Sequence, residues 1–316
     1  MSTNQQNMDF SGKRQMFVDL LLNHYLEYPN DERDKLIRGL LAVISDNNQM
    51  NILALRAYDA LQDDESRQIY ACLVLYRCVG ASYMPAIFTE MVLMTLRNRL
   101  MEKGKDLGGY GNYDSNFFLG KSYFSLPHMQ LLSSTDGGNE IFIDCGAYDG
   151  ETIKGFIEFS EGKYDKIYSF EPIPGYYKNT LQNIKNAGIQ KVELIQKGVW
   201  SSKAVFNFTD AGQASRINDS GTIPVEVVAI DEIIPKNEKV TFIKMDVEGA
   251  EFEALKGAEN TIRRCRPNLA ICIYHKPTDV VEIPALITHF FSGYKFYIRH
   301  HHLILLEETV LYALPQ

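Results

Sequence analysis

The chain has 316 residues, of which 45% are hydrophobic and 23% charged, and its formal net charge at pH 7 is -8. A globular protein of this size can bury a sizeable core and is long enough for two domains. The acidic balance argues against a protein that grips a nucleic acid backbone, which needs clustered Lys and Arg, so we expect no nucleic-acid partner.

The polar start at residues 1–7 has no apolar core of a secretory signal. Arg77 and Arg97 interrupt the apolar stretches nearest in length to a membrane span. The five cysteines are scattered without metal-ligand spacing and are expected to be reduced thiols; they are Cys72, Cys78, Cys145, Cys265 and Cys272. These features predict a cytoplasmic protein without a membrane span.

Residues 1–103 are predicted to form an all-helical N-terminal domain. Apolar residues recur at helical spacing within 36–44 and 69–76. Asn30-Asp31 and Asp63-Asp64 are suitable helix N-caps. This region has no chemical motif, so we expect a helical domain or cap, through which the chain could form a homo-oligomer.

Residues 104–139 form a glycine-rich and aromatic segment, which is long for a linker in a compact protein. Two interpretations stay open: the aromatic residues either line the near wall of a substrate cleft or pack the seam between domains. These residues are Tyr110, Tyr113, Phe117, Phe118, Tyr123 and Phe124.

From residue 140 to 316 strand and helix patterns alternate, which is typical of a parallel sheet. We predict an α/β fold with a doubly wound, seven-stranded sheet. Strands are predicted at 141–145, 166–170, 191–196, 240–245 and 268–274, and helices at 150–159, 175–187 and 249–263. Two further β-type runs cover 204–208 and 223–230, and the chain ends in an antiparallel portion at 294–298, 302–306 and 310–313.

The most informative stretch is residues 140–152, where an apolar strand ends in Asp144 and turns through Gly146 and Gly150 into a helix. Such a turn places backbone N–H groups and a helix N-terminus at the carboxyl end of the strand, where open α/β sheets bind ligands. Glu171 ends the next strand, roughly twenty residues beyond the turn, where a carboxylate can accept hydrogen bonds from a ribose.

The residues in this turn indicate which cofactor it holds. The middle glycine of the G-x-G-x-x-G dinucleotide fingerprint is missing. Asp144 and Asp149 would repel a pyrophosphate but suit the ammonium and sulfonium of S-adenosylmethionine. We therefore expect S-adenosylmethionine, with NAD or FAD as the alternative and a turn without any ligand as a third interpretation.

A second acidic cluster follows the strand at 240–245, with Asp246, Glu248 and Glu251 in six residues. This strand should lie beside the first one, so both clusters would face one cleft, with Asp246 beside the reactive methyl group. We interpret Glu251 as a first-turn acid that complements the helix dipole. His275, at the end of another strand, is a candidate general base.

Two groups of residues that contain histidine are candidate metal sites. Asp246, Glu248 and His275 act catalytically in our interpretation, and a divalent metal held by the same three residues is the alternative. Three consecutive histidines at 300–302 cannot converge on one ion from a strand, since neighbouring side chains point to opposite faces.

The succession of these motifs resembles the FkbM family of S-adenosylmethionine-dependent methyltransferases. The resemblance rests on residues 143–152 (Ile-Asp-Cys-Gly-Ala-Tyr-Asp-Gly-Glu-Thr), 170–172 (Phe-Glu-Pro), 197–201 (Lys-Gly-Val-Trp-Ser) and 243–252 (Ile-Lys-Met-Asp-Val-Glu-Gly-Ala-Glu-Phe). It implies the class I methyltransferase fold and O-methylation of sugars, polyketides or other natural products. It covers roughly residues 140–275, so the helical region and the acceptor are not explained by it.

The resemblance also implies where the cofactor binds. Tyr148 is a departure, because Asn or Ser is common there, and it should alter cofactor packing without abolishing binding. Trp200 lies either near the adenine or in the core. The expected cofactor contacts are Asp144, Gly146, Ala147, Tyr148, Asp149, Gly150, Thr152, Glu171, Pro172, Gly198, Val199 and Trp200.

The sequence thus predicts an O-methyltransferase for a small-molecule or glycan hydroxyl, working by in-line displacement. Asp246, Glu248 or His275 would remove the hydroxyl proton, and the loop at 209–221, with Ser215 and Arg216, is a candidate acceptor contact. The alternatives are an NAD-dependent oxidoreductase, or a cofactor-binding protein without activity whose helical half binds a partner.

Overall fold

The computed structural model describes residues 12–13, 16, 20, 30–79, 122–124, 126, 129–131, 137–209, 216–217, 221–301 and 308–316. Most of the predicted linker, most of the candidate acceptor loop at 209–221 and the predicted strand at 302–306 lie outside the described residues.

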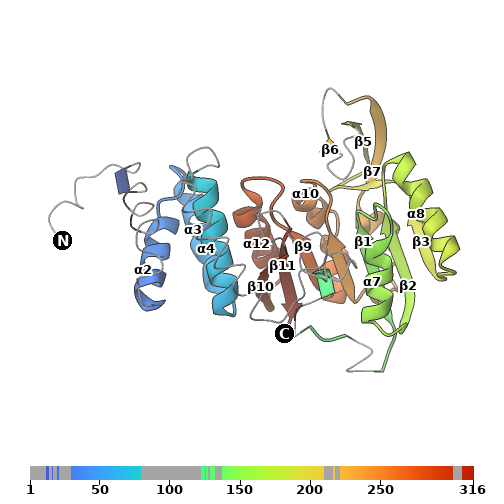
Figure 1. Cartoon of the computed structure of the whole chain (residues 1–316), viewed down its shortest axis with the longest axis horizontal. Coiled ribbons are helices and arrows are strands. Elements are labelled where there is room, and N and C mark those ends of the chain that lie inside the picture. The colour runs from blue at the N-terminus through green and yellow to red at the C-terminus, as the bar shows by residue number, and fades with distance from the viewer. Residues whose placement is uncertain are drawn as a thin grey trace, which may run out of the picture.

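The described residues form a seven-stranded sheet whose order reverses beside β1, so the predicted doubly wound α/β fold is confirmed (Figure 1). β1, β2, β3, β8 and β9 are parallel, and β11 is antiparallel to both of its neighbours. In spatial order the strands are β10 (Tyr294–His300), β11 (Thr309–Pro315), β9 (Asn268–Cys272), β8 (Phe242–Met245), β1 (Glu140–Cys145), β2 (Tyr164–Phe170) and β3 (Val192–Ile195). The reversal puts the ends of β1 and β8 side by side, where a ligand cleft is expected.

The two β-type runs between the main strands belong to a separate four-stranded sheet, drawn at the upper right of Figure 1. Its own small apolar cluster includes Phe208, Val225 and Val227. In spatial order its strands are β4 (Gly198–Val199), β7 (Ile223–Val228), β5 (Ala204–Thr209) and β6 (Arg216–Ile217).

Side chains of the main sheet alternate between two apolar clusters, as the two-residue period of a strand requires. In β1, Phe142 faces one cluster and Ile143 the other. The first cluster contains residues of α7 (Glu151–Phe159), α8 (Pro174–Asn186) and the 3₁₀ helix η2 (Ser122–Phe124). The second contains residues of α10 (Glu251–Lys256), α11 (Glu259–Cys265) and α12 (Asp279–Phe290), and it also includes Ile230 of the short α9 (Ile230–Ile233).

The helix predicted at 249–263 is instead two helices, α10 and α11, separated at Gly257. A Cβ at Gly257 would lie 2.0 Å from the carbonyl oxygen of Trp200. Because of this close approach, the break between α10 and α11 packs against the segment at Trp200, next to β4 of the second sheet.

Three N-terminal helices lie beside the C-terminal half of the sheet at the left of Figure 1: α2 (Asn30–Leu41), α3 (Asn48–Ala60) and α4 (Asp64–Val79). α3 packs on α12 and α4 on β10. The side chain of Asp63 accepts the backbone N–H of Ser66 at 2.8 Å, so the predicted cap of α4 is present. The division into domains at residues 103 and 139 stays a prediction.

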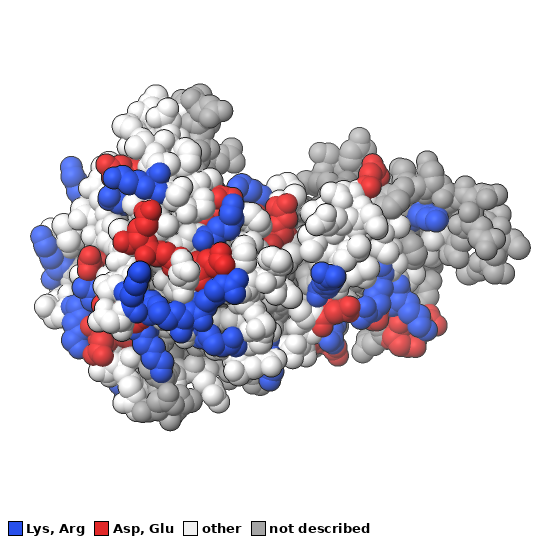
Figure 2. Space-filling view, turned by 180° about the vertical axis from the view of Figure 1, so that it is seen from behind, with Lys and Arg blue, Asp and Glu red and all other residues white. Residues whose placement is uncertain are grey.

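Among the described residues, no helix has the length and apolar character to span a membrane. On the face seen from behind, Lys and Arg side chains lie next to Asp and Glu side chains (Figure 2). This face therefore has no single large acidic patch among the described residues, although the chain has a net negative charge.

Candidate functional site

The turn after β1 is wedged between the ends of its two neighbouring strands. The backbone N–H groups of Gly146 and Ala147 both donate to the carbonyl of Phe170 at 3.0 Å. Gly146 has φ +91°, and a Cβ there would lie 2.0 Å from the carbonyl oxygen of Asp246. Only glycine fits this position, because it tolerates both the left-handed backbone and the close approach.

Asp144 is fully buried and pairs with Lys244, whose Nζ lies 3.2 Å from its carboxylate. The register explains the pairing, since Asp144 is directly opposite Lys244 on β8 and Ser169 on β2. Ser169 donates to Asp144 at 3.0 Å, and Lys244 donates to the carbonyl of Gly146 at 2.7 Å. Asp144 therefore positions Lys244, which in turn binds the glycine turn. A direct contact between Asp144 and the cofactor stays a prediction.

Burial determines the ionisation of this pair. Desolvation raises the pKa of Asp144, and the nearby Lys244 only partly opposes it. Burial alone would lower the pKa of Lys244, yet Asp144 and Asp246 together raise it. The lysine is therefore a fixed positive charge inside an acidic site.

Glu171 links the glycine turn after β1 to the start of α8. Its carboxylate accepts the backbone N–H of Tyr148 at 2.9 Å and that of Ile173 at 2.8 Å. Burial raises the pKa of Glu171 to about 7, although both backbone donors lower it. A carboxylate has about four lone-pair sites, so two remain for the hydroxyls of a ribose.

The rest of the glycine turn is held by short side chains of α8. Thr180 donates to the carbonyl of Tyr148 at 2.6 Å and Asn183 to that of Asp149 at 2.9 Å. Asp149 accepts the backbone N–H of Glu151 at 3.0 Å, so its carboxylate satisfies one free N–H in the first turn of α7, whose N-cap residue is Gly150. Gly150 has φ +87° and precedes the helix, and Thr152 lies partly exposed in its first turn.

The remaining expected cofactor contacts lie where β2 meets the second sheet. A Cβ at Gly198 would lie 3.7 Å from Pro172, and Val199 is buried beside them. The ring of Trp200 meets the ring of Phe206 edge-on at 5.1 Å, within the cluster of the second sheet. Trp200 thus has a packing role here, and a contact with an adenine stays a prediction.

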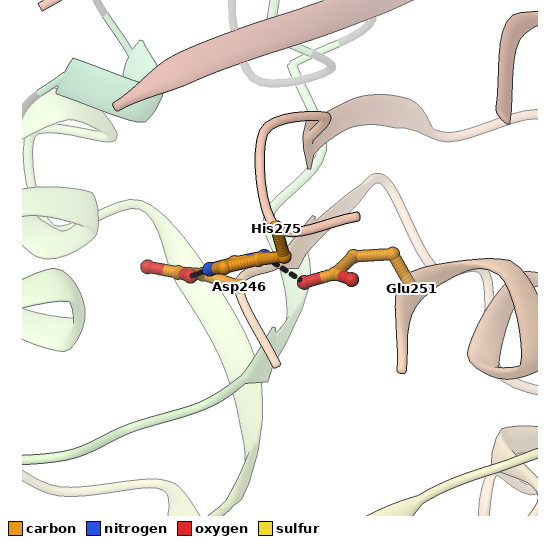
Figure 3. A group of neighbouring side chains, drawn as sticks. All are labelled: Asp246, Glu251 and His275. Atoms are coloured by element: carbon orange, nitrogen blue, oxygen red, sulfur yellow. Dashed lines mark ion pairs between the residues drawn. The ribbon is translucent and has the colours of Figure 1, made fainter. Parts of the chain in front are cut away.

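Asp246, Glu251 and His275 form the second cluster, in which the imidazole lies between the two carboxylates (Figure 3). His275 Nε2 is 3.4 Å from Asp246 and 3.7 Å from Glu248, and Nδ1 is 2.8 Å from Glu251. Tyr123 donates to the other oxygen of Asp246 at 2.7 Å. The structure therefore brings the three predicted catalytic residues together.

The charges in this cluster favour the ionised forms. Burial alone would lower the pKa of His275, but Glu251, Asp246 and Glu248 raise it to about 10. Burial alone would raise the pKa of Asp246, but Lys244 and His275 lower it. Without another cation, His275 holds its proton at neutral pH, and Asp246 is the carboxylate ready to accept one.

Three residues of the site were missed or assigned differently from the sequence. Glu251 was interpreted as a helix-dipole acid, yet its buried carboxylate contacts His275. The sequence signal for Lys244 is a charged residue inside an otherwise apolar strand. Tyr123 belongs to the aromatic segment; its hydroxyl reaches the site, whereas its neighbour Phe124 packs on Phe142 and Phe156.

The consecutive histidines have separate partners, as the strand period predicts. His300 contacts Thr309 at 2.9 Å, and His301 contacts Tyr312 at 3.0 Å. His302 lies outside the described residues.

Residues 144–303, about half of the chain, match the methyltransferase FkbM domain. The chain belongs to the FkbM methyltransferase family. The matched region begins at Asp144 and contains Glu171, Asp246 and His275, so both clusters of the site lie in the FkbM domain.

Two proteins similar to this chain add to the family assignment. A curated hexuronic acid methyltransferase, AglP of Haloferax volcanii, is 26% identical over 128 residues, which are 39% of this chain and 52% of AglP. The crystal structure of a methyltransferase FkbM from Methylobacillus flagellatus KT has 22% identity and a TM-score of 0.61, and the match covers 88% of this chain and 62% of that chain. The chain therefore spans about half of the curated relative and under two thirds of the solved one, and the solved structure supports the fold.

Proposed function

We propose that this FkbM-family protein is an S-adenosylmethionine-dependent O-methyltransferase that acts on a sugar or glycan hydroxyl. The main support is the placement of Glu171 and Asp246 at the ends of β2 and β8, on either side of the glycine turn after β1. The name of the AglP relative, a hexuronic acid methyltransferase, supports a sugar as the acceptor class.

The residues present fit this cofactor. Glu171 keeps acceptor sites for two ribose hydroxyls, and Gly146 lets the turn after β1 lie directly against the backbone of Asp246. Asp246 has one oxygen without a hydrogen-bond partner, and its negative charge suits a sulfonium. Bound S-adenosylmethionine would supply an activated methyl group.

The protein's own contribution is to orient the reactants and to accept a proton. Tyr123 fixes one oxygen of Asp246, which leaves the other oxygen for the acceptor hydroxyl or for His275. Lys244 and His275 keep Asp246 ionised, so it can take the hydroxyl proton as the oxygen attacks. Most of the expected acceleration comes from alignment and from exclusion of water.

The test is transfer of a radiolabelled methyl group from S-adenosylmethionine to glycans with and without hexuronic acid. We expect label in the sugar of the glycan. A thermal shift with NAD and none with S-adenosylmethionine would instead support an oxidoreductase. Binding of S-adenosylmethionine without transfer to any glycan would support a cofactor-binding protein.

The variant Glu171→Ala tests the ribose contact. It removes charge-assisted hydrogen bonds worth ~1.5–3 kcal/mol, so its dissociation constant for S-adenosylmethionine should rise about ten- to hundred-fold. Calorimetry gives this constant directly. Glu193→Ala is the matched control, because Glu193 lies on the next strand, β3, and pairs at the surface with Lys166. Unchanged affinity in Glu171→Ala would refute the ribose assignment.

A further inference from the structure

The ring nitrogen Nε2 of His275 lies in a pocket of carboxylate oxygens without a hydrogen bond. It is buried and has no hydrogen-bond partner, and the same holds for Oδ1 of Asp246. Nε2 is 3.4 Å from this Oδ1 and 3.7 Å from Oε1 of Glu248. The histidine side chain is only 8% exposed, so bulk water does not replace these missing bonds.

The two distances from Nε2 to these carboxylate oxygens are compatible with ligands around one ion. Nitrogen and oxygen ligands lie about 2.0–2.2 Å from a divalent cation, so neighbouring ligand atoms are roughly 3.0–3.5 Å apart in tetrahedral or octahedral geometry. The distances from Nε2 to the two carboxylate oxygens, 3.4 and 3.7 Å, are at or just above the top of this range. They are long for direct hydrogen bonds.

The other ring nitrogen lies beside a carboxylate, as it does in many metal-binding histidines, in an ion pair without hydrogen-bond geometry. Oε1 of Glu251 is 2.8 Å from Nδ1 and also accepts the backbone N–H of Val247 at 2.9 Å. A carboxylate in this position fixes the ring and directs Nε2 toward a metal. Figure 3 shows Glu251 and Asp246 on opposite sides of the ring, so Glu251 orients the histidine while Asp246 faces the proposed ion.

The turn that presents Glu248 has an unusual backbone. Glu248 has φ +53° and the next residue, Gly249, has φ +92°. A left-handed conformation in a residue other than glycine costs of order 1 kcal/mol or more and is concentrated at functional sites. Here it brings the Glu248 carboxylate back to the histidine.

We propose that Asp246, Glu248 and His275 bind one divalent cation, with Glu251 orienting the histidine. The ligand set of two carboxylates and one imidazole suits Mn²⁺ or a similar ion. The use of the ion rests on the proposed function: open coordination positions would take the acceptor hydroxyl and lower its pKa. With the ion bound, the free oxygen of Asp246 is a ligand and no longer the base, so the hydroxyl proton passes to water, and the oxygen–carbon bond forms as the carbon–sulfur bond of the donor breaks.

The experiment is a titration of the full chain with Mn²⁺, followed by electron paramagnetic resonance, with neither S-adenosylmethionine nor an acceptor present. We expect one Mn²⁺ per chain. Glu248→Gln should weaken binding at least tenfold, and Glu251→Gln about ten- to hundred-fold because it loses the orienting partner. The control Glu259→Gln should bind Mn²⁺ as the parent does, since Glu259 pairs with Arg263 on α11.

The possible outcomes distinguish failure of the metal-site proposal from failure of the proposed function. Absence of stoichiometric Mn²⁺ binding, or unchanged binding in Glu248→Gln, would overturn the metal site even if methyl transfer is observed. Mn²⁺ binding that depends on Glu248, without methyl transfer, would keep the site and refute the function. Glu248 is 29% exposed, so Glu248→Gln should fold, and circular dichroism checks this.

Discussion

At the scale of single residues, Glu171 should make the stability of the protein depend on pH. Burial raises its pKa from 4.5 to about 7 in the folded state. Between these values the folded state binds the proton more tightly than the unfolded state, so the contribution of Glu171 to stability falls as pH rises through this window.

The variant Glu171→Gln cannot ionise and should escape this loss. The free energy of unfolding of the variant, minus that of the parent, should therefore rise by on the order of 1–3 kcal/mol from about pH 5 to about pH 8. Urea unfolding of both proteins at each pH gives this difference. A difference independent of pH would mean that Glu171 is ionised equally in the folded and unfolded states.

The residues of the site show which of its parts the sequence can predict. The acids at 144, 171 and 246 were predicted because each follows an apolar strand. Their partners were not, because the pairing of Asp144 with Lys244 depends on the register between β1 and β8, which are far apart in sequence. The contact of Tyr123 with Asp246 likewise depends on how η2 packs under the sheet.

At the scale of elements, the turn after β1 is the most constrained connection in the site. The variant Gly146→Ala would place a methyl group 2.0 Å from the carbonyl oxygen of Asp246 at φ +91°. The left-handed strain alone is worth about 1–3 kcal/mol, and the overlap adds to it. Urea denaturation should therefore show a loss of more than about 1 kcal/mol, together with weaker binding of S-adenosylmethionine.

Two other glycines separate strain from overlap in this prediction. Gly162 has φ +73° with no atom within 4 Å of an added Cβ, so Gly162→Ala should show the strain alone. Gly175 also has open space and no left-handed backbone, so Gly175→Ala should be neutral or slightly stabilising. If Gly146→Ala were no worse than Gly162→Ala, the turn would be free to move away from β8.

The strands and helices were largely predictable because their periodicity is local. Strong apolar runs gave β1, β2, β8 and β9, and the helices α7 and α8 begin and end within a residue of the predicted positions. The division between α10 and α11 and the separate second sheet were not predictable in this way. Both result from contacts between distant segments, such as Gly257 with Trp200.

At the scale of the whole molecule, the N-terminal helices and the sheet share one apolar cluster. Ile69 and Leu73 of α4 belong to the same cluster as Ile298 of β10 and Ile283 of α12. A polar contact ties the same elements together: Asp63 pairs with Arg299 at 2.6 Å, and Ser66 accepts the backbone N–H of Ile298 at 2.9 Å. We therefore expect the described helices and the sheet to unfold together in one transition.

The variant Asp63→Asn tests this coupling, because asparagine can still cap α4 but loses the charge opposite Arg299. Its free energy of unfolding should fall by about 1–3 kcal/mol, as expected for hydrogen bonds to a charged group. Asp59→Asn is the control, since Asp59 pairs with Arg38 at the surface and should change stability by roughly 0–1 kcal/mol. Far-ultraviolet circular dichroism follows the helices of both parts, whereas fluorescence of Trp200, the single tryptophan, follows the α/β part alone. If Asp63→Asn shifted only the circular dichroism transition, the helices would be an independent domain; a common shift of both signals means that their stability depends on the sheet.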